Sequence, residues 1–405
     1  MRKPVLTIFY QFNPWNPTIG GIQALVRYFI KYTPSDFTLR FVGTSSDAST
    51  PIGQWQPAEL EGRSLQFMPL FYLENDNIKQ TIPTSVRYTQ ALMGKQLESD
   101  FMHFYRLEPT LATRNWQGEK TLFIQNDILQ QVAASGDKNA ILWRRFPQAY
   151  FILERLLVKQ FDYVLSCNSE SMKLYQERYP EIAHRVSYFH NVFDGEVFYP
   201  LSAPDRESAR KQLAQRLNLA EDTRFVLFAG RLHPQKDPLL LIDSFAALKQ
   251  PNVHLLIVGD GDLAEAVRER IAQQGLTNRV TLLGALQQSA VADLHRLASA
   301  CILTSAYEGM PFVALEALAC GTPLVTTHCG ETPSLLTATS GVITPDRTPD
   351  AIAQSLEQVL NHPHQYPAQA CAQVAQPYNA RHVVHAVCES MLHRWAAPRV
   401  VHSAA

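Results

Sequence analysis

The sequence lacks any long apolar run. Among its 405 residues, no stretch approaches the roughly 18 uninterrupted apolar residues that a membrane-spanning helix needs. Near the start, Arg2 and Lys3 precede an apolar run of only Val5 to Tyr10, and Pro14 and Pro17 follow it. We therefore expect this run to be a first β-strand rather than a signal peptide or an anchor.

An excess of charge of one sign and a cysteine framework are also missing. Lys and Arg number 36 against 37 Asp and Glu, so the composition gives no reason to expect a nucleic-acid partner. The six cysteines form no C-x-x-C pair and have no histidine at a spacing suited to zinc. We expect reduced core cysteines in a cytoplasmic protein, and leave open an association with the inner face of the membrane.

What is present is a repeated alternation of short apolar runs with stretches of helical period, which is typical of βαβ units around parallel sheets. The length favours two domains. Proline and charge interrupt the pattern near residue 200, so we expect a first domain over 1–200 and a second over 201–378, followed by a terminal helix at about 379–396. The strands expected in the first domain are Val5 to Tyr10, Leu39 to Val42, Thr121 to Gln125, Tyr163 to Cys167 and Val186 to Phe189.

The second half is the more regular. Its expected strands read as continuous apolar runs, as strands buried on both faces do, which predicts a doubly wound parallel sheet. They are Phe225 to Ala229, His254 to Val258, Val280 to Leu283, Cys301 to Thr304 and Pro323 to Thr326, and helices are expected to begin near Pro238, Leu263, Ala290 and Pro311.

Two basic residues lie in one loop, GRLHPQKDP, directly after the strand FVLFAG. Ligands bind at such carboxyl ends in doubly wound sheets. Arg231 and Lys236 could grip neighbouring phosphate oxygens and neutralise a leaving diphosphate. Taken alone, the loop is equally well explained as a solvated basic turn.

A second turn, VGDGD from Val258 to Asp262, also follows a strand. Paired aspartates can hold a divalent cation. However, acids are favoured at a helix N-terminus in any case, so we favour a structural turn and expect no metal.

The strongest segment is SAYEGMPFVALEALACGTP, from Ser305 to Pro323. Because Pro311 suits the first turn of a helix, the backbone from Gly309 to Val313 should present free N–H groups and a positive dipole end to an anion. Glu308 precedes this helix, whereas Glu316 lies within it among apolar neighbours and needs a polar partner there. Both carboxylates can face one pocket at different depths, where one can meet a sugar and the other a ribose.

These motifs together resemble glycosyltransferase family 4. The resemblance runs from the first strand to the terminal helix and is dense between about residues 225 and 335. There the G-R-L-x-x-x-K loop, the V-G-D-G turn, the V-T-L-L-G strand and the two glutamates eight residues apart follow one another in the family's order. It implies the retaining GT-B fold: two Rossmann-like doubly wound domains facing a central cleft, with a C-terminal helix crossing back to the first.

The resemblance also implies a role for each matching residue. Arg231 and Lys236 would bind the donor diphosphate, and together with Glu308, which contacts the donor sugar, they would form the catalytic group. Glu316 would hold the ribose. The remaining donor contacts would be Gly20 and Gly21 of the first domain and the backbone of Gly309, Met310, Pro311, Phe312 and Val313.

The first domain departs from the family pattern. Asn126, in the segment IQND, stands where many relatives have a histidine, and it can bind a sugar hydroxyl but cannot act as an acid or base. His103 is near another family histidine, although a structural role is favoured for it. The basic aromatic stretch around Trp143 could contact anionic lipid or pack as an ordinary helix.

We therefore expect a retaining hexosyltransferase that moves a sugar from a nucleoside-diphosphate sugar to an acceptor hydroxyl, without a metal or another cofactor. The acceptor would be a sugar, lipid-linked or glycoconjugate molecule in bacterial-type glycan biosynthesis. The alternatives are a nucleotide-sugar epimerase or hydrolase on the same fold, and a GT-B binding module without catalysis.

Overall fold

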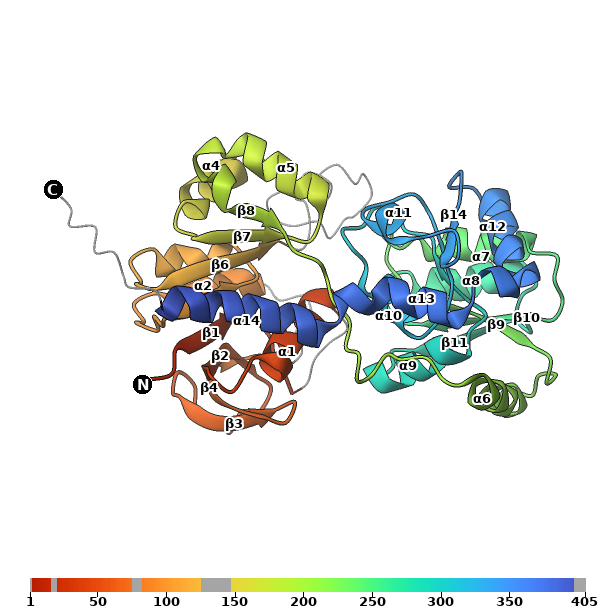
Figure 1. Ribbon diagram of the computed structural model, residues 1–405, viewed down its shortest axis with the longest axis horizontal. Helices are drawn as coiled ribbons and strands as arrows, with labels where there is room; N and C mark the ends of the chain where they lie inside the picture. The colour runs from red at the N-terminus through yellow and green to blue at the C-terminus, as the bar shows by residue number, and fades with distance from the viewer. Residues whose placement is uncertain (1, 16–19, 75–81, 125–146, 397–405) are drawn as a thin grey trace. The chain divides into compact units, whose positions relative to one another are not determined.

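A computed structural model describes residues 2–15, 20–74, 82–124 and 147–396 (Figure 1). The chain forms two compact units: the first contains residues up to His190 and from Ala380 onward, and the second contains Asn191–Asn379. Asn126 and Trp143 lie outside the described residues, as does the part of the basic aromatic stretch before residue 147.

The second unit begins at Asn191 rather than near residue 200. The reason is the packing of the segment that follows. Phe193 and Phe198 are buried in the core of the second unit, and the guanidinium of Arg296 donates hydrogen bonds to backbone carbonyls in the same segment. The prolines that marked a boundary in the sequence therefore lie within the second unit.

The first unit is built on an eight-stranded sheet in the order β3-β4-β2-β1-β5-β6-β7-β8. All neighbouring strands are parallel except β3 and β4. Its elements are β1 (Val5–Phe9), α1 (Gly21–Tyr32), β2 (Thr38–Ser45), β3 (Gln56–Leu60), β4 (Arg63–Tyr72), α2 (Thr84–Leu92), β5 (Phe101–Phe104), η1 (Glu108–Thr113), β6 (Glu119–Ile124), α4 (Pro147–Val158), β7 (Tyr163–Ser166), α5 (Ser169–Arg178), η3 (Pro180–Arg185), β8 (Val186–Tyr188) and α14 (Ala380–Ala396).

Three of these strands were not predicted. The strands β3 and β4 form a hairpin whose two-residue turn, Glu61 and Gly62, has positive φ at both positions, as the turns that match strand twist require. The strand β5 was missed because only four residues pair, and one of them is His103. The other five predicted strands of this unit are present, and their ends lie within three residues of the expected ones.

Helices cover both faces of the first sheet. Side chains from α2, α4 and α5 pack with the strands in one core. On the other face, Phe29 of α1 contacts Phe123 and His103 of the sheet.

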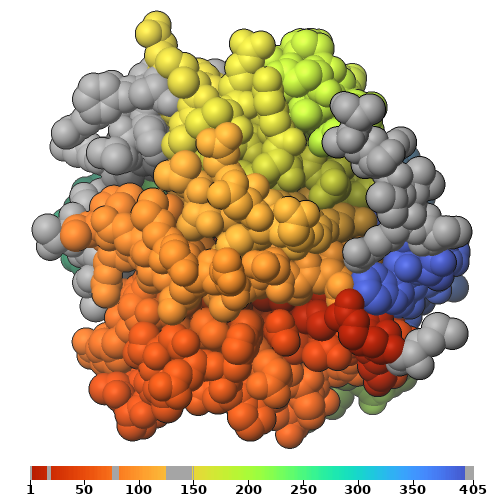
Figure 2. All heavy atoms as spheres, turned by 90° about the vertical axis from the view of Figure 1, so that its left-hand side faces the viewer, coloured from red at the N-terminus to blue at the C-terminus, as the bar shows by residue number. Residues whose placement is uncertain are grey.

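The terminal helix α14 lies beside α1 on that second face (Figure 1). Arg394 donates to both carboxylate oxygens of Glu119 at 2.6 and 2.7 Å, and Arg2 lies over the ring of Trp395 at 4.9 Å. Figure 2 shows the blue terminal helix emerging next to the dark red N-terminal segment. The predicted return of the terminal helix to the first unit is confirmed.

The second unit is built on a six-stranded parallel sheet in the order β11-β10-β9-β12-β13-β14. Its elements are α6 (Ala203–Arg216), β9 (Arg224–Ala229), α7 (Pro238–Ala247), β10 (Val253–Val258), α8 (Ala264–Gln273), β11 (Val280–Gly284), α9 (Gln288–Leu297), β12 (Ala300–Leu303), α10 (Phe312–Ala319), β13 (Leu324–Thr326), α11 (Thr332–Leu335), β14 (Gly341–Ile343), α12 (Pro349–Asn361), η4 (Pro363–Gln365), α13 (Ala368–Ala375) and η5 (Gln376–Tyr378).

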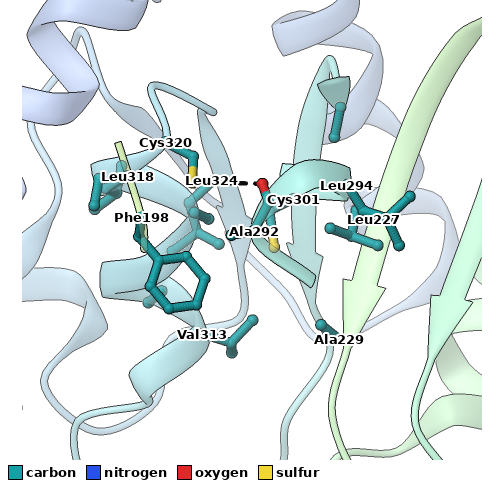
Figure 3. Close-up of a cluster of buried hydrophobic side chains, with 14 of the residues drawn as sticks. Phe198, Leu227, Ala229, Ala292, Leu294, Cys301, Val313, Leu318, Cys320 and Leu324 are labelled. Carbon is teal, nitrogen blue, oxygen red and sulfur yellow. Dashed lines mark hydrogen bonds between the residues drawn. The ribbon is translucent and has the colours of Figure 1, made fainter. Parts of the chain in front are cut away.

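Two separate cores flank this sheet, because successive strand residues point to opposite faces. Phe225 and Leu227 of β9 join the core that contains side chains of α6, α9, α10 and α13, whereas Val226 and Phe228 join the core with α7, α8 and α12. Figure 3 shows part of the first core, where the Cys320 thiol lies 3.7 Å from the carbonyl oxygen of Ala292. The continuous apolar runs of the sequence are therefore strands covered on both faces, and the doubly wound prediction is confirmed.

All six cysteines are free and buried, in agreement with the expected core positions. Over the described part of the chain, no helix combines the length and the apolar character needed to cross a bilayer.

Candidate functional site

The candidate donor site lies at the carboxyl edge of the second sheet, where the strand order changes direction between β9 and β12. The loops that follow these two strands are joined by hydrogen bonds. Thr304 Oγ1 donates to the carbonyl of Lys236 at 2.9 Å, and the backbone N–H of Ala306 donates to the carbonyl of Gln235 at 2.8 Å. A switch in strand order leaves an opening at which doubly wound proteins bind ligands.

Lys236 and Glu308 meet across these loops. The Lys236 ammonium forms a short ion pair with Oε1 of Glu308, and the side chains are only 16% and 6% exposed. Ser305 Oγ donates to the same oxygen at 2.6 Å. The ammonium has two further N–H donors, so it can hold the carboxylate and still contact a phosphate.

Arg231 lies in the same loop as Lys236 but is exposed. Its guanidinium has no hydrogen bond or ion pair with any residue that the structure describes. A cation held on a short loop without a protein partner is available to an anionic ligand.

The VGDGD turn packs against this loop. Its two glycines are required by close approach: a Cβ on Gly259, where φ is +133°, would lie 1.9 Å from the carbonyl oxygen of Gly230. The backbone N–H of Leu232 donates to the carbonyl of Asp260 at 3.0 Å. Within the described residues, no cluster of three or more His, Cys, Asp or Glu side chains could hold a metal. The close packing of the turn against the loop explains why both of these positions are glycine, as expected for a structural turn.

The turn from Gly309 to Pro311 leads into α10. Pro311 is the N-cap of this helix, with φ −71° and ψ 127°, and the helix begins at Phe312, close to the expected start near Pro311. Because a proline N-cap has no side chain that can accept a hydrogen bond, it leaves the N–H groups of Phe312 and Val313 uncapped. This end of the helix retains the predicted capacity for an anion.

A further segment, residues 327–332 after β13, holds this turn in place and was not singled out from the sequence. The backbone N–H of Glu331 donates to the carbonyl of Gly309 at 2.9 Å. Gly330 has φ +56°, and a Cβ there would lie 2.1 Å from the same carbonyl oxygen. Its only sequence signal was a glycine following a predicted strand.

Glu316 lies in the middle of α10 and is half-buried. Burial raises its pKa to about 7, and a hydrogen bond from Gln288 at the start of α9 lowers it in part. Gln288 is thus the polar partner that a carboxylate among apolar neighbours was expected to need, although the sequence did not identify it.

In the first unit, Gly20 is the N-cap of α1 with extended backbone, and both Gly20 and Gly21 are exposed. A Cβ on Gly20 would meet only the side chain of Gln23, at 3.7 Å or more. The fold therefore does not require glycine at this position, which favours the expected approach of a ligand to the backbone.

His103 is 1% exposed, and its ring lies edge-on to Phe29 and Phe123 with centroid separations of 5.1 Å. Burial lowers its pKa to about 3, so it is neutral at ordinary pH. The contact of His103 with a sugar or acceptor stays a prediction, and the structure places its ring among aromatic side chains. The structural role favoured from sequence fits this burial.

Arg106 is a candidate that the sequence did not reveal. It follows β5, at the switch point between β1 and β5 of the first sheet. The residue is exposed, and its guanidinium interacts with Tyr10 and Glu108. It was missed because β5 itself was missed.

Comparison with known proteins gives these features a context. Residues 209–376 match the family described as glycosyl transferases group 1. A D-inositol 3-phosphate glycosyltransferase of Mycobacteroides abscessus is 31% identical over 182 residues, which cover 44% of this chain and 39% of that protein. The chain spans about half or less of the length of the curated relatives that it matches.

Solved structures resemble nearly the whole chain. Sucrose-phosphate synthase from Thermosynechococcus elongatus has a TM-score of 0.77 at 18% identity and covers 98% of this chain and 100% of its own. Anabaena Alr3699/HepE, solved in complex with UDP-glucose, has a TM-score of 0.71 at 18% identity, with 96% and 100% covered. At this identity the likeness shows the fold alone, and that fold is GT-B.

Proposed function

We propose that the chain is a retaining hexosyltransferase, because its residues 209–376 match the family described as glycosyl transferases group 1. It takes a sugar from a nucleoside-diphosphate sugar and attaches it to an acceptor hydroxyl. The donor binds to the second unit and the acceptor to the first. The complex of the Anabaena protein with UDP-glucose supports a nucleotide-sugar donor.

The observation that carries the proposal is the Lys236–Glu308 pair beside the uncapped start of α10. Departure of a diphosphate from the sugar develops negative charge on the leaving oxygens and positive charge at the anomeric carbon. Lys236, Arg231 and the N–H groups of Phe312 and Val313 stabilise the leaving group. Glu308, which is held beside these groups, contacts the sugar.

The contacts of Glu308 bear on its role. One of its oxygens already accepts from Lys236 and from Ser305, which stabilises the carboxylate as an acceptor and reduces its reactivity as a nucleophile. We therefore favour deprotonation of the acceptor by the leaving phosphate over a covalent intermediate on Glu308.

Glu316 binds the ribose of the donor. Glu316 lies in the same helix whose first turn binds the phosphate. The two oxygens of its carboxylate can accept hydrogen bonds from the two neighbouring hydroxyls of the ribose. The desolvation that raises its pKa would also strengthen such hydrogen bonds. Arg231 and Lys236 supply the charge that other transferases obtain from a cation, so we propose that no metal is needed.

The acceptor site is proposed at the switch point of the first sheet, near Arg106, Tyr10 and Glu108. A guanidinium can donate to the hydroxyls of a sugar, and a carboxylate next to it can accept from neighbouring hydroxyls. Such an acceptor fits a sugar, lipid-linked or glycoconjugate molecule in bacterial-type glycan biosynthesis, with peripheral membrane association in the lipid-linked case.

The proposal is tested by incubating the protein with labelled nucleoside-diphosphate hexoses and a panel of sugar acceptors, with a chelator present throughout. We expect a glycoside with the anomeric configuration of the donor, as read by NMR. Release of free sugar would instead identify a hydrolase, and an isomerised nucleotide sugar an epimerase. Binding of the donor without any turnover would identify a binding module.

A further inference from the structure

Asn191 is buried, with 3% of its surface exposed, and it is the first residue of the second unit. Its side-chain amide Nδ2 donates a hydrogen bond to the carbonyl oxygen of Met310 at 2.7 Å. Met310 lies in the turn between Glu308 and α10, which is 119 residues away in the sequence. A side-chain hydrogen bond therefore joins the first residue of the second unit to the candidate donor turn.

The orientation of this amide follows from its partner. If the amide were rotated by half a turn, its oxygen would face the oxygen of Met310, and two acceptors would oppose each other. In the orientation observed, the side-chain oxygen Oδ1 is buried and has no hydrogen-bond partner among the described residues. An amide satisfied on one side only is a poor contributor to stability, so stability alone does not account for an asparagine here.

The peptide groups of the donor turn are fixed one after another. The carbonyl of Gly309 accepts from the backbone N–H of Glu331 at 2.9 Å. Because the C=O and N–H of a trans peptide point in opposite directions, the N–H of Met310 then faces away from Glu331. The carbonyl of Met310 is held by Asn191, which sets the peptide leading into Pro311. The direction of the first turn of α10 follows from these two bonds.

The point at which the chain leaves the second unit lies beside Asn191. The backbone N–H of Phe193 donates to the carbonyl of Tyr378 at 3.0 Å, and Phe193 pairs with Asn379 in a parallel bridge. Burial raises the pKa of Tyr378, and the nearby charge of Glu331 raises it further. The entering and leaving segments thus both approach residues that hold the donor turn.

We propose that Asn191 is a positioning residue of the donor site, which orients the turn Gly309–Pro311 toward the diphosphate and sugar through the Met310 carbonyl. This inference rests on the proposed function. Asn191 touches no reacting atom in this role. Its removal should therefore weaken interactions with the diphosphate and the sugar but leave those with the ribose unchanged, because Glu316 lies more than a turn further along α10.

The experiment compares binding of a nucleoside-diphosphate sugar with binding of the corresponding nucleoside monophosphate, by calorimetry. The variants are Asn191→Ala and Asn191→Ser, the second of which retains a short donor. Asn168→Ala is the matched control: Asn168 is also buried, and its side chain caps α5 in the first unit by accepting from Ser171 N at 2.8 Å. Thermal denaturation verifies that each variant is folded.

We expect Asn191→Ala to weaken binding of the nucleotide sugar at least tenfold, to change binding of the monophosphate less than threefold, and to raise KM for the donor more than it lowers kcat. Asn191→Ser should recover part of the loss, and Asn168→Ala should lower the melting temperature without changing either affinity. Equal affinities in the parent and Asn191→Ala, or equal weakening of both ligands, would overturn the inference. Failure of the parent to bind any nucleotide sugar would instead overturn the proposed function.

Discussion

Glu316 gives the sharpest test of the donor site, because its pKa of about 7 places its ionisation in the range where binding is measured. Two ribose hydroxyls need a carboxylate that accepts from both, so the deprotonated form should bind the donor. With a pKa of about 7, about nine tenths of the protein carries this form at pH 8 and about one tenth at pH 6. Donor affinity should therefore fall about tenfold from pH 8 to pH 6.

The assay is calorimetric titration of a nucleoside-diphosphate sugar, whose phosphates carry no proton that titrates in this range. The neighbouring thiols of Cys301 and Cys320 stay protonated, since burial raises the pKa of both. A basic group that gained a proton beside the diphosphate would add positive charge and strengthen binding as the pH falls. The sign of the effect thus separates Glu316 from a basic group.

The same pKa has a consequence for stability. The folded protein holds a proton on Glu316 up to about pH 7, whereas the unfolded chain releases it near the usual glutamate pKa of 4.5. Stability therefore falls as the pH rises through this window, by at most about 3 kcal/mol. Glu316→Gln should raise the free energy of unfolding at pH 8, weaken donor binding, and remove its pH dependence. A parent affinity that is constant from pH 6 to pH 8, or an unchanged slope in Glu316→Gln, would refute the reasoning.

Three further predictions follow from the contacts around the two candidate sites. Lys236→Met should abolish sugar transfer and lower the free energy of unfolding by about 3 kcal/mol, because Glu308 is left buried without its cation. Adding Glu308→Gln to this variant should restore stability but not activity. A double variant that regained activity would contradict the roles assigned to Lys236 and Glu308. Gly259→Ala should lower the free energy of unfolding, measured by chemical denaturation, by at least about 3 kcal/mol. Gly275→Ala is the control, because φ there is +66° and nothing lies within 4 Å, and it should lower the free energy of unfolding by only about 1 kcal/mol. Similar losses in the two variants would show that the close approach of Gly259 to Gly230 does not determine the cost. Arg106→Ala should raise KM for the acceptor about tenfold or more and leave the donor Kd unchanged in titration, and an effect on the donor would remove Arg106 from the acceptor site.

The second unit was predictable because its strands are buried on both faces. Phe225 to Phe228 must be apolar at every position, since alternate side chains enter two different cores, and such runs are evident in a sequence. The first sheet was harder, because β3 lies at its edge and alternates between partly exposed and exposed residues, and because β5 includes the buried His103.

Local patterns also located the loops that carry Arg231, Lys236 and Glu308, but not the contacts between distant segments. The bond from Asn191 to Met310 and the packing of Gly330 against Gly309 depend on the final arrangement of the second unit. Gln288, as the partner of Glu316, depends on how α9 packs against α10. No spacing within a single segment encodes these pairs.

The pairing of Phe193 with Asn379 has a consequence for biogenesis. The second unit is inserted into the sequence of the first, and its two ends lie side by side. The segment 191–379 can therefore fold before the first unit is complete. The first unit still needs α14, whose Arg394 pairs with Glu119, and this helix leaves the ribosome only after the whole inserted unit. During synthesis, the unit that starts first is therefore the one that finishes last.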